Sequence, residues 1–165
     1  MDSTIQNAPE QQTDQRIALL TAKVAELSEA NRSLANTQML VEAMLDNIPD
    51  RIYFKDAQSR FVKVSKALAK RLGVEHPDDA VGKTDFDFYP DTKAREFYED
   101  EQRIIKTGEP LINKVERQVR KNGDVAWSST TKVLLRSRDG TVVGIVGINR
   151  DITDLKLAEQ KIEAI

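Results

Sequence analysis

Residues 140–155 read GTVVGIVGINRDITDL, and this stretch decides the fold. Over residues 141–148 apolar side chains occupy both sides of an extended chain. A strand that is apolar on both faces is covered on both faces, so we expect it at the centre of its sheet. A polar segment follows, and Asp or Thr before a helix-prone run is an N-cap signal. The stretch therefore predicts a buried strand that leads directly into an exit helix.

The composition restricts the class of protein. The chain has 165 residues, which is room for one domain of ordinary size and an extension. Its net charge of −2 gives no basic excess for binding nucleic acid or an anionic membrane surface. It has no cysteine, which excludes disulfides and thiolate metal sites. No apolar run approaches the roughly 20 residues of a membrane helix, so we expect a cytoplasmic protein with no membrane segment in this stretch.

The N-terminal third predicts a coiled coil. Residues 1–15 are polar and are predicted to be a disordered lead-in, and residues 16–46 are predicted to form one dimerisation helix. Spacings of three and four place the following residues on a heptad seam: Ile17, Leu20, Val24, Leu27, Asn31 and Leu34. β-branched residues at a and Leu at d favour a parallel homodimer, and Asn31 at an a position fixes its register. The alternative is a single amphipathic helix folded onto its own domain.

Residues 47–153 predict one domain of five strands and two helices. The expected strands are 51–55, 60–65, 111–120, 125–135 and 141–148, and the expected helices are 66–72 and 91–107. Asn-Gly and Asp-Gly turns separate the last three strands. This order indicates an α+β fold, an antiparallel sheet with helices on one face. Residues 154–165 are expected to begin the exit helix, because apolar residues keep a three/four spacing there.

Four pieces of the sequence resemble a PAS domain of the sensory type common in bacterial signalling proteins. They are DNIPDRIYFKDAQSRFVKVS at 46–65, GKTDFDFYP at 82–90, KNGDVAWSSTTKVLLRSRDG at 121–140 and GIVGINRDITDLK at 144–156. The resemblance covers about residues 40–155. It implies a five-stranded sheet with the last strand at its centre. It also implies that Asp151 and Thr153, in the Asp-Ile-Thr motif, couple the core to the outgoing helix.

Polar residues on two expected inner strand faces are the candidate ligand contacts. They are Asn113 and Arg117 on one strand, and Trp127, Ser129 and Thr131 on the next. On the first strand they share a face with Val115 and Val119. Polar groups on an otherwise apolar face either bond a ligand or are satisfied by neighbours or water. A one-residue bulge would turn these side chains to solvent instead.

The sequence offers no catalytic or metal constellation. No acidic pair combines with a nucleophile, a base or a metal cluster, so we expect no enzyme and no metal site. Asp85 is expected to cap a helix. Haem-binding relatives place an axial histidine on the long helix, and residues 91–107 contain none, which disfavours haem. The lack of cysteine excludes cysteinyl-flavin photochemistry, and the cofactor is left unknown.

These observations predict a sensory and regulatory module that dimerises. Binding of a small molecule would be the signal, and the module would relay it through coiled-coil helices to an output domain. Domains of this kind commonly occur beside histidine kinase or diguanylate cyclase domains, so we expect one of these as the output domain. Two alternatives remain. A ligand-free dimerisation spacer would have a collapsed apolar core, and a protein-partner docking domain would have an exposed apolar patch.

Overall fold

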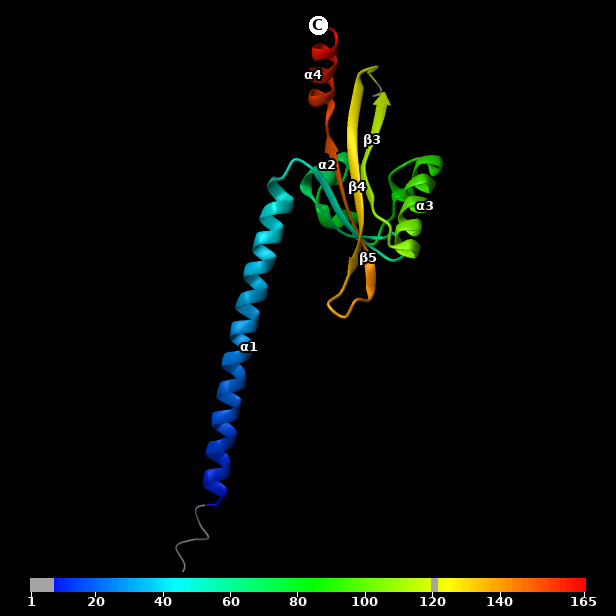
Figure 1. Cartoon of the computed structure of the whole chain (residues 1–165). Coiled ribbons are helices and arrows are strands. Elements are labelled where there is room, and N and C mark those ends of the chain that lie inside the picture. Colours follow the sequence, from blue (N-terminus) through cyan, green and yellow to red (C-terminus); the bar gives the residue numbers. More distant parts are fainter. Residues whose placement is uncertain (1–7, 120–121) are drawn as a thin grey trace, which may run out of the picture. The chain divides into compact units, whose positions relative to one another are not determined.

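The computed structural model describes residues 8–119 and 122–165. It has the predicted α+β fold, with five strands, a long N-terminal helix and shorter helices (Figure 1). The elements in order are α1 (Ala8–Asn47), β1 (Arg51–Asp56), β2 (Phe61–Val64), α2 (Lys66–Leu72), η1 (Pro77–Ala80), η2 (Asp85–Asp87), α3 (Asp91–Thr107), β3 (Leu111–Val119), β4 (Val125–Arg136), β5 (Val142–Asp151) and α4 (Thr153–Glu163). Residues 1–7 of the predicted lead-in lie outside the described residues, as does residue 120 at the end of the third predicted strand.

Strand β5 is the centre of the sheet, as predicted, but the expected cover on both of its faces is not found among the described residues, since Ile148 is 40% exposed. The strand order is β2-β1-β5-β4-β3, and all neighbouring pairs are antiparallel. Ile145 of β5 has no exposed surface. The strand runs on into α4 with one residue between them, so the centre of the sheet leads directly to the exit helix (Figure 1).

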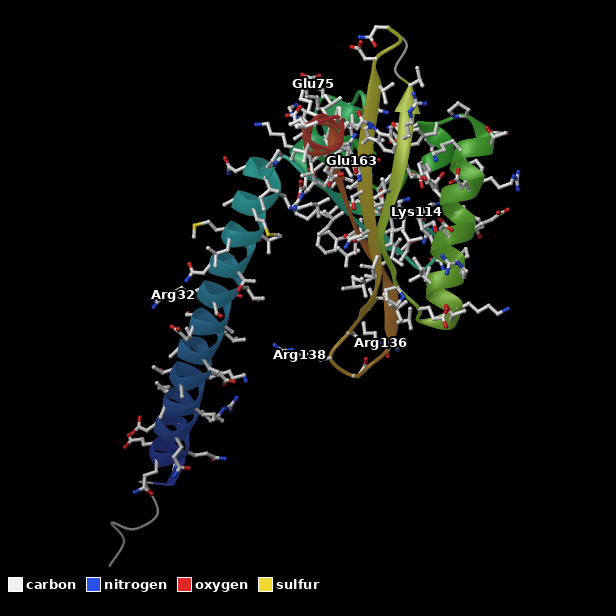
Figure 2. All side chains as sticks on the ribbon, turned by 45° about the horizontal axis from the view of Figure 1, so that its top comes forward. Arg32, Glu75, Lys114, Arg136, Arg138 and Glu163 are labelled. Carbon is white, nitrogen blue, oxygen red and sulfur yellow. The ribbon has the colours of Figure 1, made fainter. Side chains whose placement is uncertain are left out.

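Helix α1 begins earlier than the sequence analysis predicted. Residues 8–15 are helical rather than part of a disordered lead-in. Pro9 is tolerated because the first helical turn needs no amide donor, and the Glu and Gln residues that follow are good helix formers. The helix through residue 43 forms one compact unit and the rest of the chain another. In the single chain its heptad residues are exposed, Val24 by 62%, and side chains project from all round the helix (Figure 2).

The hydrophobic core lies between the sheet and the helices. Its largest members are Tyr53, Phe61, Val64, Leu68, Ile104 and Ile145. Gly147 lies opposite Tyr53 in the pairing of β1 with β5. A Cβ atom at Gly147 would come within 2.1 Å of the Tyr53 ring, so the missing side chain leaves the space in which that ring packs.

The two faces of β3 are the reverse of those predicted. The pairing of β3 with β4 shifts between Leu111 and Lys114, and Asn113 between them has a φ of 50°. This bulge turns the strand by one residue. Val115 and Val119 are therefore 47% and 62% exposed, and do not form an apolar inner face. Lys114 and Glu116, on the opposite face of β3, form ion pairs with residues of α3.

Candidate functional site

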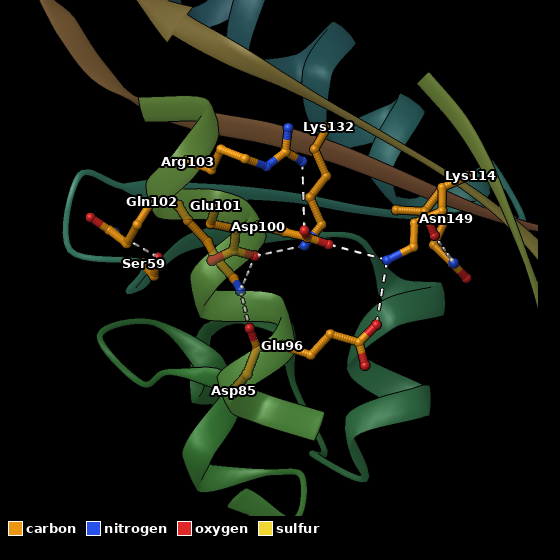
Figure 3. Close-up of polar contacts among 12 residues, drawn as sticks. Ser59, Asp85, Glu96, Asp100, Glu101, Gln102, Arg103, Lys114, Lys132 and Asn149 are labelled. Atoms are coloured by element: carbon orange, nitrogen blue, oxygen red, sulfur yellow. Dashed lines mark hydrogen bonds and ion pairs between the residues drawn. The ribbon is translucent and has the colours of Figure 1, made fainter. Parts of the chain in front are cut away.

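Four ionisable side chains meet in the interior between the sheet and α3. Lys55 of β1 donates hydrogen bonds to Asp85 of η2 and, at 2.8 Å, to Oε1 of Glu101 on α3. Lys132 of β4 donates to the same Glu101 oxygen at 3.2 Å (Figure 3). Asp85 is the most exposed of the four, at 7%. Two ammonium groups and two carboxylates cancel in charge, and this pairing is what makes the burial of ions tolerable.

The spacing of these residues from their buried neighbours in the sequence explains why their side chains meet. Lys55 is two residues after Tyr53 on β1, so both point to the inner face of the sheet. Glu101 is seven residues after buried Ala94 and three before buried Ile104, on the stripe of α3 that faces the sheet. Glu101 was not among the site residues predicted from the sequence. The detectable signal was a charged residue at a position where the helical period calls for an apolar one.

Asp85 has a different role from the one predicted. Thr84, not Asp85, occupies the N-cap of η2, and the Asp85 carboxylate binds Lys55. The N-cap position of α3 is occupied by Pro90, so Asp85 does not cap that helix either. A carboxylate next to a helix start is a common capping pattern, but a buried ammonium group attracts it more strongly here because water is excluded.

Burial shifts the pKa of one acid and one base of the cluster, Asp85 and Lys132, toward the neutral form. Burial raises the pKa of Asp85, and the charge of Lys55 opposes this rise. Burial lowers the pKa of Lys132, with Glu101 opposing. Aromatic rings supply part of the compensation, because the Lys55 ammonium lies 4.5 Å from the centre of the Phe61 ring. The Lys132 ammonium lies 5.1 Å from the ring centre of Phe97.

A cavity of about 460 Å³ adjoins this cluster, within the size range of small-molecule sites. Its inner end is formed by buried residues, among them Lys55, Phe61, Glu101 and Lys132. Its outer end is formed by partly or fully exposed residues, namely Arg51, Arg71, Arg117, Gln118 and Val119. The cavity is therefore closed and charge-paired at one end, and open and basic at the other.

One oxygen of the cluster is not satisfied. Both lysines bind Oε1 of Glu101, and Oε2 is buried with no hydrogen-bond partner among the described residues. A buried carboxylate oxygen without a donor costs free energy. Glu101 therefore marks the inner end of the cavity as a place where a hydrogen-bond donor is needed.

The five predicted ligand contacts are distributed differently. Arg117 lines the cavity. Asn113 and Thr131 contact each other, since the Asn113 amide donates to Thr131 Oγ1 at 3.1 Å. Ser129 and Thr131 alternate along β4 with the cavity-lining Thr130 and Lys132, so they fall on the other face of the sheet. Trp127 borders a small hollow beside the cavity, together with Ser128 and Asp151. Ligand contact by these residues stays a prediction.

The predicted coupling residues lie where β5 passes into α4. Asp151 Oδ1 accepts hydrogen bonds from the backbone N–H of Thr153 at 2.9 Å and from its hydroxyl at 2.6 Å. Thr153 Oγ1 in turn accepts from the Trp127 amide of β4 at 3.0 Å. The first residue of α4 is thereby attached to the sheet. At the same end, the Arg150 guanidinium donates to both oxygens of Asp50, which stands just before β1.

Two further findings concern metals and membranes. Within residues 8–119 and 122–165, no cluster of three or more His, Asp or Glu side chains is arranged to hold a metal ion. The side chain of His76, the single histidine of the chain, is 74% exposed. No helix in the described part of the chain has the length and apolar character needed to cross a membrane.

Comparison with known proteins gives the family. The PAS fold family matches residues 45–157, so the chain belongs to the PAS family. It is 31% identical over 132 residues to the methanogenesis regulatory histidine kinase FilI of Methanothrix harundinacea, covering 80% of this chain and 15% of that protein. It is 25% identical over 138 residues to a diguanylate cyclase of Vibrio cholerae, covering 82% and 43%. The chain thus spans less than half the length of these relatives.

Solved structures show the same fold. The Vibrio cholerae VqmA dimer superposes with a TM-score of 0.60 at 24% identity, covering 68% of this chain and 50% of that one. The PAS domain of Bordetella pertussis BvgS gives a TM-score of 0.58 at 22% identity, covering 82% and 99%. At these identities the likeness shows the fold alone. No catalytic domain is evident in the residues that the structure describes.

The buried cluster can be tested by removing its shared acid. Glu101→Ala leaves two buried lysines with one carboxylate, so we expect the free energy of unfolding to fall by about 3 kcal/mol. Urea denaturation followed by circular dichroism measures it. The matched control is Glu159→Ala, which breaks the exposed 2.8 Å pair of Lys156 with Glu159 and should cost about 0.5 kcal/mol or less. Equal costs for the two variants would contradict a stabilising role for the cluster.

Proposed function

We propose that this chain is a sensory module that binds a small molecule in the cavity between the sheet and α3. The observation that carries the proposal is the cavity itself, of about 460 Å³, with a buried charged cluster at its inner end. A spacer without a ligand would fill this region with apolar side chains, because buried ions need compensation. Glu101 Oε2 also offers a hydrogen-bond acceptor there.

The relatives support a signalling role. FilI is a regulatory histidine kinase, and a second relative is a diguanylate cyclase. VqmA has been solved bound to DPO, which is a precedent for ligand binding in this fold. We propose that the module passes its signal to an output domain of the kinase or cyclase class. Its own part is regulatory and not catalytic.

The signal path that we propose runs through β5 to α4. Thr153 is attached to Asp151 and to β4, so a change in the sheet near the cavity would change the first turn of α4. Such coupling is a population shift between two arrangements. The ligand must bind one of them more tightly, or the equilibrium does not change.

The first experiment is native mass spectrometry of protein purified from cells, before and after denaturation. We expect a dimer that carries an additional small mass, which denaturation removes. Gln118→Trp narrows the outer end of the cavity and should reduce the fraction carrying this mass. Thr92→Trp, at an exposed position of α3 that does not line the cavity, is the matched control.

A second measurement, the melting temperature, makes the experiment decisive. The melting temperature is measured with and without the small-molecule fraction of a cell extract, because a ligand of the folded state stabilises it. Protein without added mass, and with an unchanged melting temperature, would contradict ligand binding and leave the spacer as the better account.

Dimerisation through α1 is the second part of the proposal. The exposed heptad residues give a single helix no stable way to cover its apolar seam. Replacing Asn31 by Leu at its a position should broaden the oligomer distribution beyond dimers, because a buried Asn pair selects two strands. Sedimentation velocity measures the distribution. Asn36→Leu, at an outward f position, should leave the dimer unchanged, and unchanged dimers for both variants would rule out this role of Asn31.

Coupling at the exit can be tested at Thr153. Thr153→Val keeps the shape of the side chain but removes the oxygen that accepts from the Trp127 amide. We expect faster hydrogen exchange at Trp127 and in the first turn of α4, with the exchange of β1 unchanged. Thr92→Val on α3 is the matched control. Unchanged exchange at Trp127 would show that the bond does not hold α4 to the sheet.

One observation favours a second candidate function, docking of a partner protein. Several apolar residues of the sheet surface opposite the cavity are exposed, among them Val115 and Ile148. Exposed apolar surface of this kind is typical of interaction sites. Docking would use the opposite face of the sheet from the ligand, so the two functions are compatible in one domain.

A further inference from the structure

A small hollow extends the outer end of the cavity. Its volume is about 40 Å³, and it shares Arg51, Arg71 and Gln118 with the cavity. Its other walls include Ser128 of β4 and Asp151 of β5, which lie opposite each other in the sheet. The cavity and the hollow thus form one continuous site with a narrow polar end.

Ser128 is the unusual residue of this hollow. It is 5% exposed, and its hydroxyl has no hydrogen-bond partner among the described residues. Buried hydroxyl groups in proteins are almost always bonded, and an unbonded one needs an explanation. A serine hydroxyl can donate to an acceptor in the hollow. Ser128 therefore points to an acceptor group of a bound molecule.

The charges of the site indicate the sign of that molecule. Among the described residues, six Lys and Arg residues line the cavity against three Asp and Glu residues. At the inner end the lysines are balanced by Asp85 and Glu101, so the excess lies at the outer end. In the hollow, two arginines stand against Asp151, whose Oδ1 accepts from Thr153. Basic side chains therefore outnumber acidic ones at the outer end, and this surplus favours an anionic group.

We propose that the ligand is a small organic monoanion, a carboxylate with a flat apolar body. The carboxylate occupies the hollow, where it accepts hydrogen bonds from the Ser128 hydroxyl and from Arg51 and Arg71. The body lies in the cavity against the aromatic rings of Tyr53 and Phe97. A planar carboxylate suits both the small volume of the hollow and the fork geometry of arginine. This inference rests on the proposed function of the cavity.

The hollow lies next to the start of α4, so the charge of a ligand bound there can affect this helix. Asp151 borders the hollow and also accepts the hydrogen bonds of Thr153 at the start of α4. A carboxylate that engages the arginines competes with Asp151 for positive charge. The anionic group, and not the apolar body, then changes the contacts at the junction of β5 with α4.

Two probes of equal shape test the charge preference. They are 2-naphthoate and its neutral analogue 2-naphthamide, titrated into the isotope-labelled full chain and followed by backbone amide NMR shifts. We expect the carboxylate to bind at least tenfold more tightly, with shifts at Ser128, Thr130 and Tyr53. Ser128→Ala and Arg71→Gln should each weaken carboxylate binding at least fivefold and weaken amide binding less, because the amide carbonyl is the weaker acceptor.

The variants separate binding from folding. Because Ser128→Ala removes a buried hydroxyl without a partner, the melting temperature of the unliganded variant should not fall. Ser129→Ala on the other face of β4 and Arg95→Gln on the exposed side of α3 are the matched controls, and both should bind as the original chain does. A loss of carboxylate binding in Ser128→Ala with unchanged melting temperature is the supporting result.

Other outcomes overturn the inference. Equal affinity for the two probes, or a carboxylate preference that Ser128→Ala and Arg71→Gln leave intact, would show that the hollow holds only water. No binding of the carboxylate also overturns it, whatever the amide does. In each case a small added mass in native mass spectrometry would leave the proposed function standing, whereas protein without added mass and with an unchanged melting temperature would remove both.

Discussion

The ammonium group of Lys55 is the interaction on which the interior depends. It reaches from β1 to Asp85 of η2 and to Glu101 of α3, and Glu101 also holds Lys132 of β4. Two parts of the chain, η2 and α3, are thus attached to the sheet through ions rather than through apolar contact alone. Ion pairs of this kind are sensitive to geometry, because an ion that loses its partner in the interior is costly. The position of α3 against the sheet is therefore specified narrowly.

This constraint shapes the cavity. The long side chains of the cluster meet at the inner end, and the charges there are already balanced. Beyond them the walls become more exposed and more basic toward Arg51 and Arg71. A molecule that enters meets apolar and aromatic surface along its body and positive charge at the outer end. The same end holds the hydrogen bonds of Asp151 and Thr153, so the ligand recognition and the signal output that we propose would share one region.

Because β5 is central, the outer end of the cavity is connected to both neighbouring strands and to α4. The strand pairs with β1 on one side and β4 on the other, and continues into α4. At its C-terminal end Arg150 binds Asp50 ahead of β1, while Thr153 binds β4 through Trp127. The exit of the chain is consequently attached to both neighbours of the central strand. A change on either side of the sheet can reach α4 through these bonds.

The sequence by itself determined the order, the class and the centre of the fold. Apolar patterns with strand or helix spacing depend only on residues that are close together in the sequence. They predicted the positions of β5, α2 and α3 correctly. The tertiary structure decided which polar side chains share the cavity. One bulge at Asn113 reversed the faces of β3, and Glu101 met Lys55 across 46 residues of chain. Local periodicity contains no information about a one-residue shift in pairing or about distant partners, because both are fixed only when the strands and helices pack together.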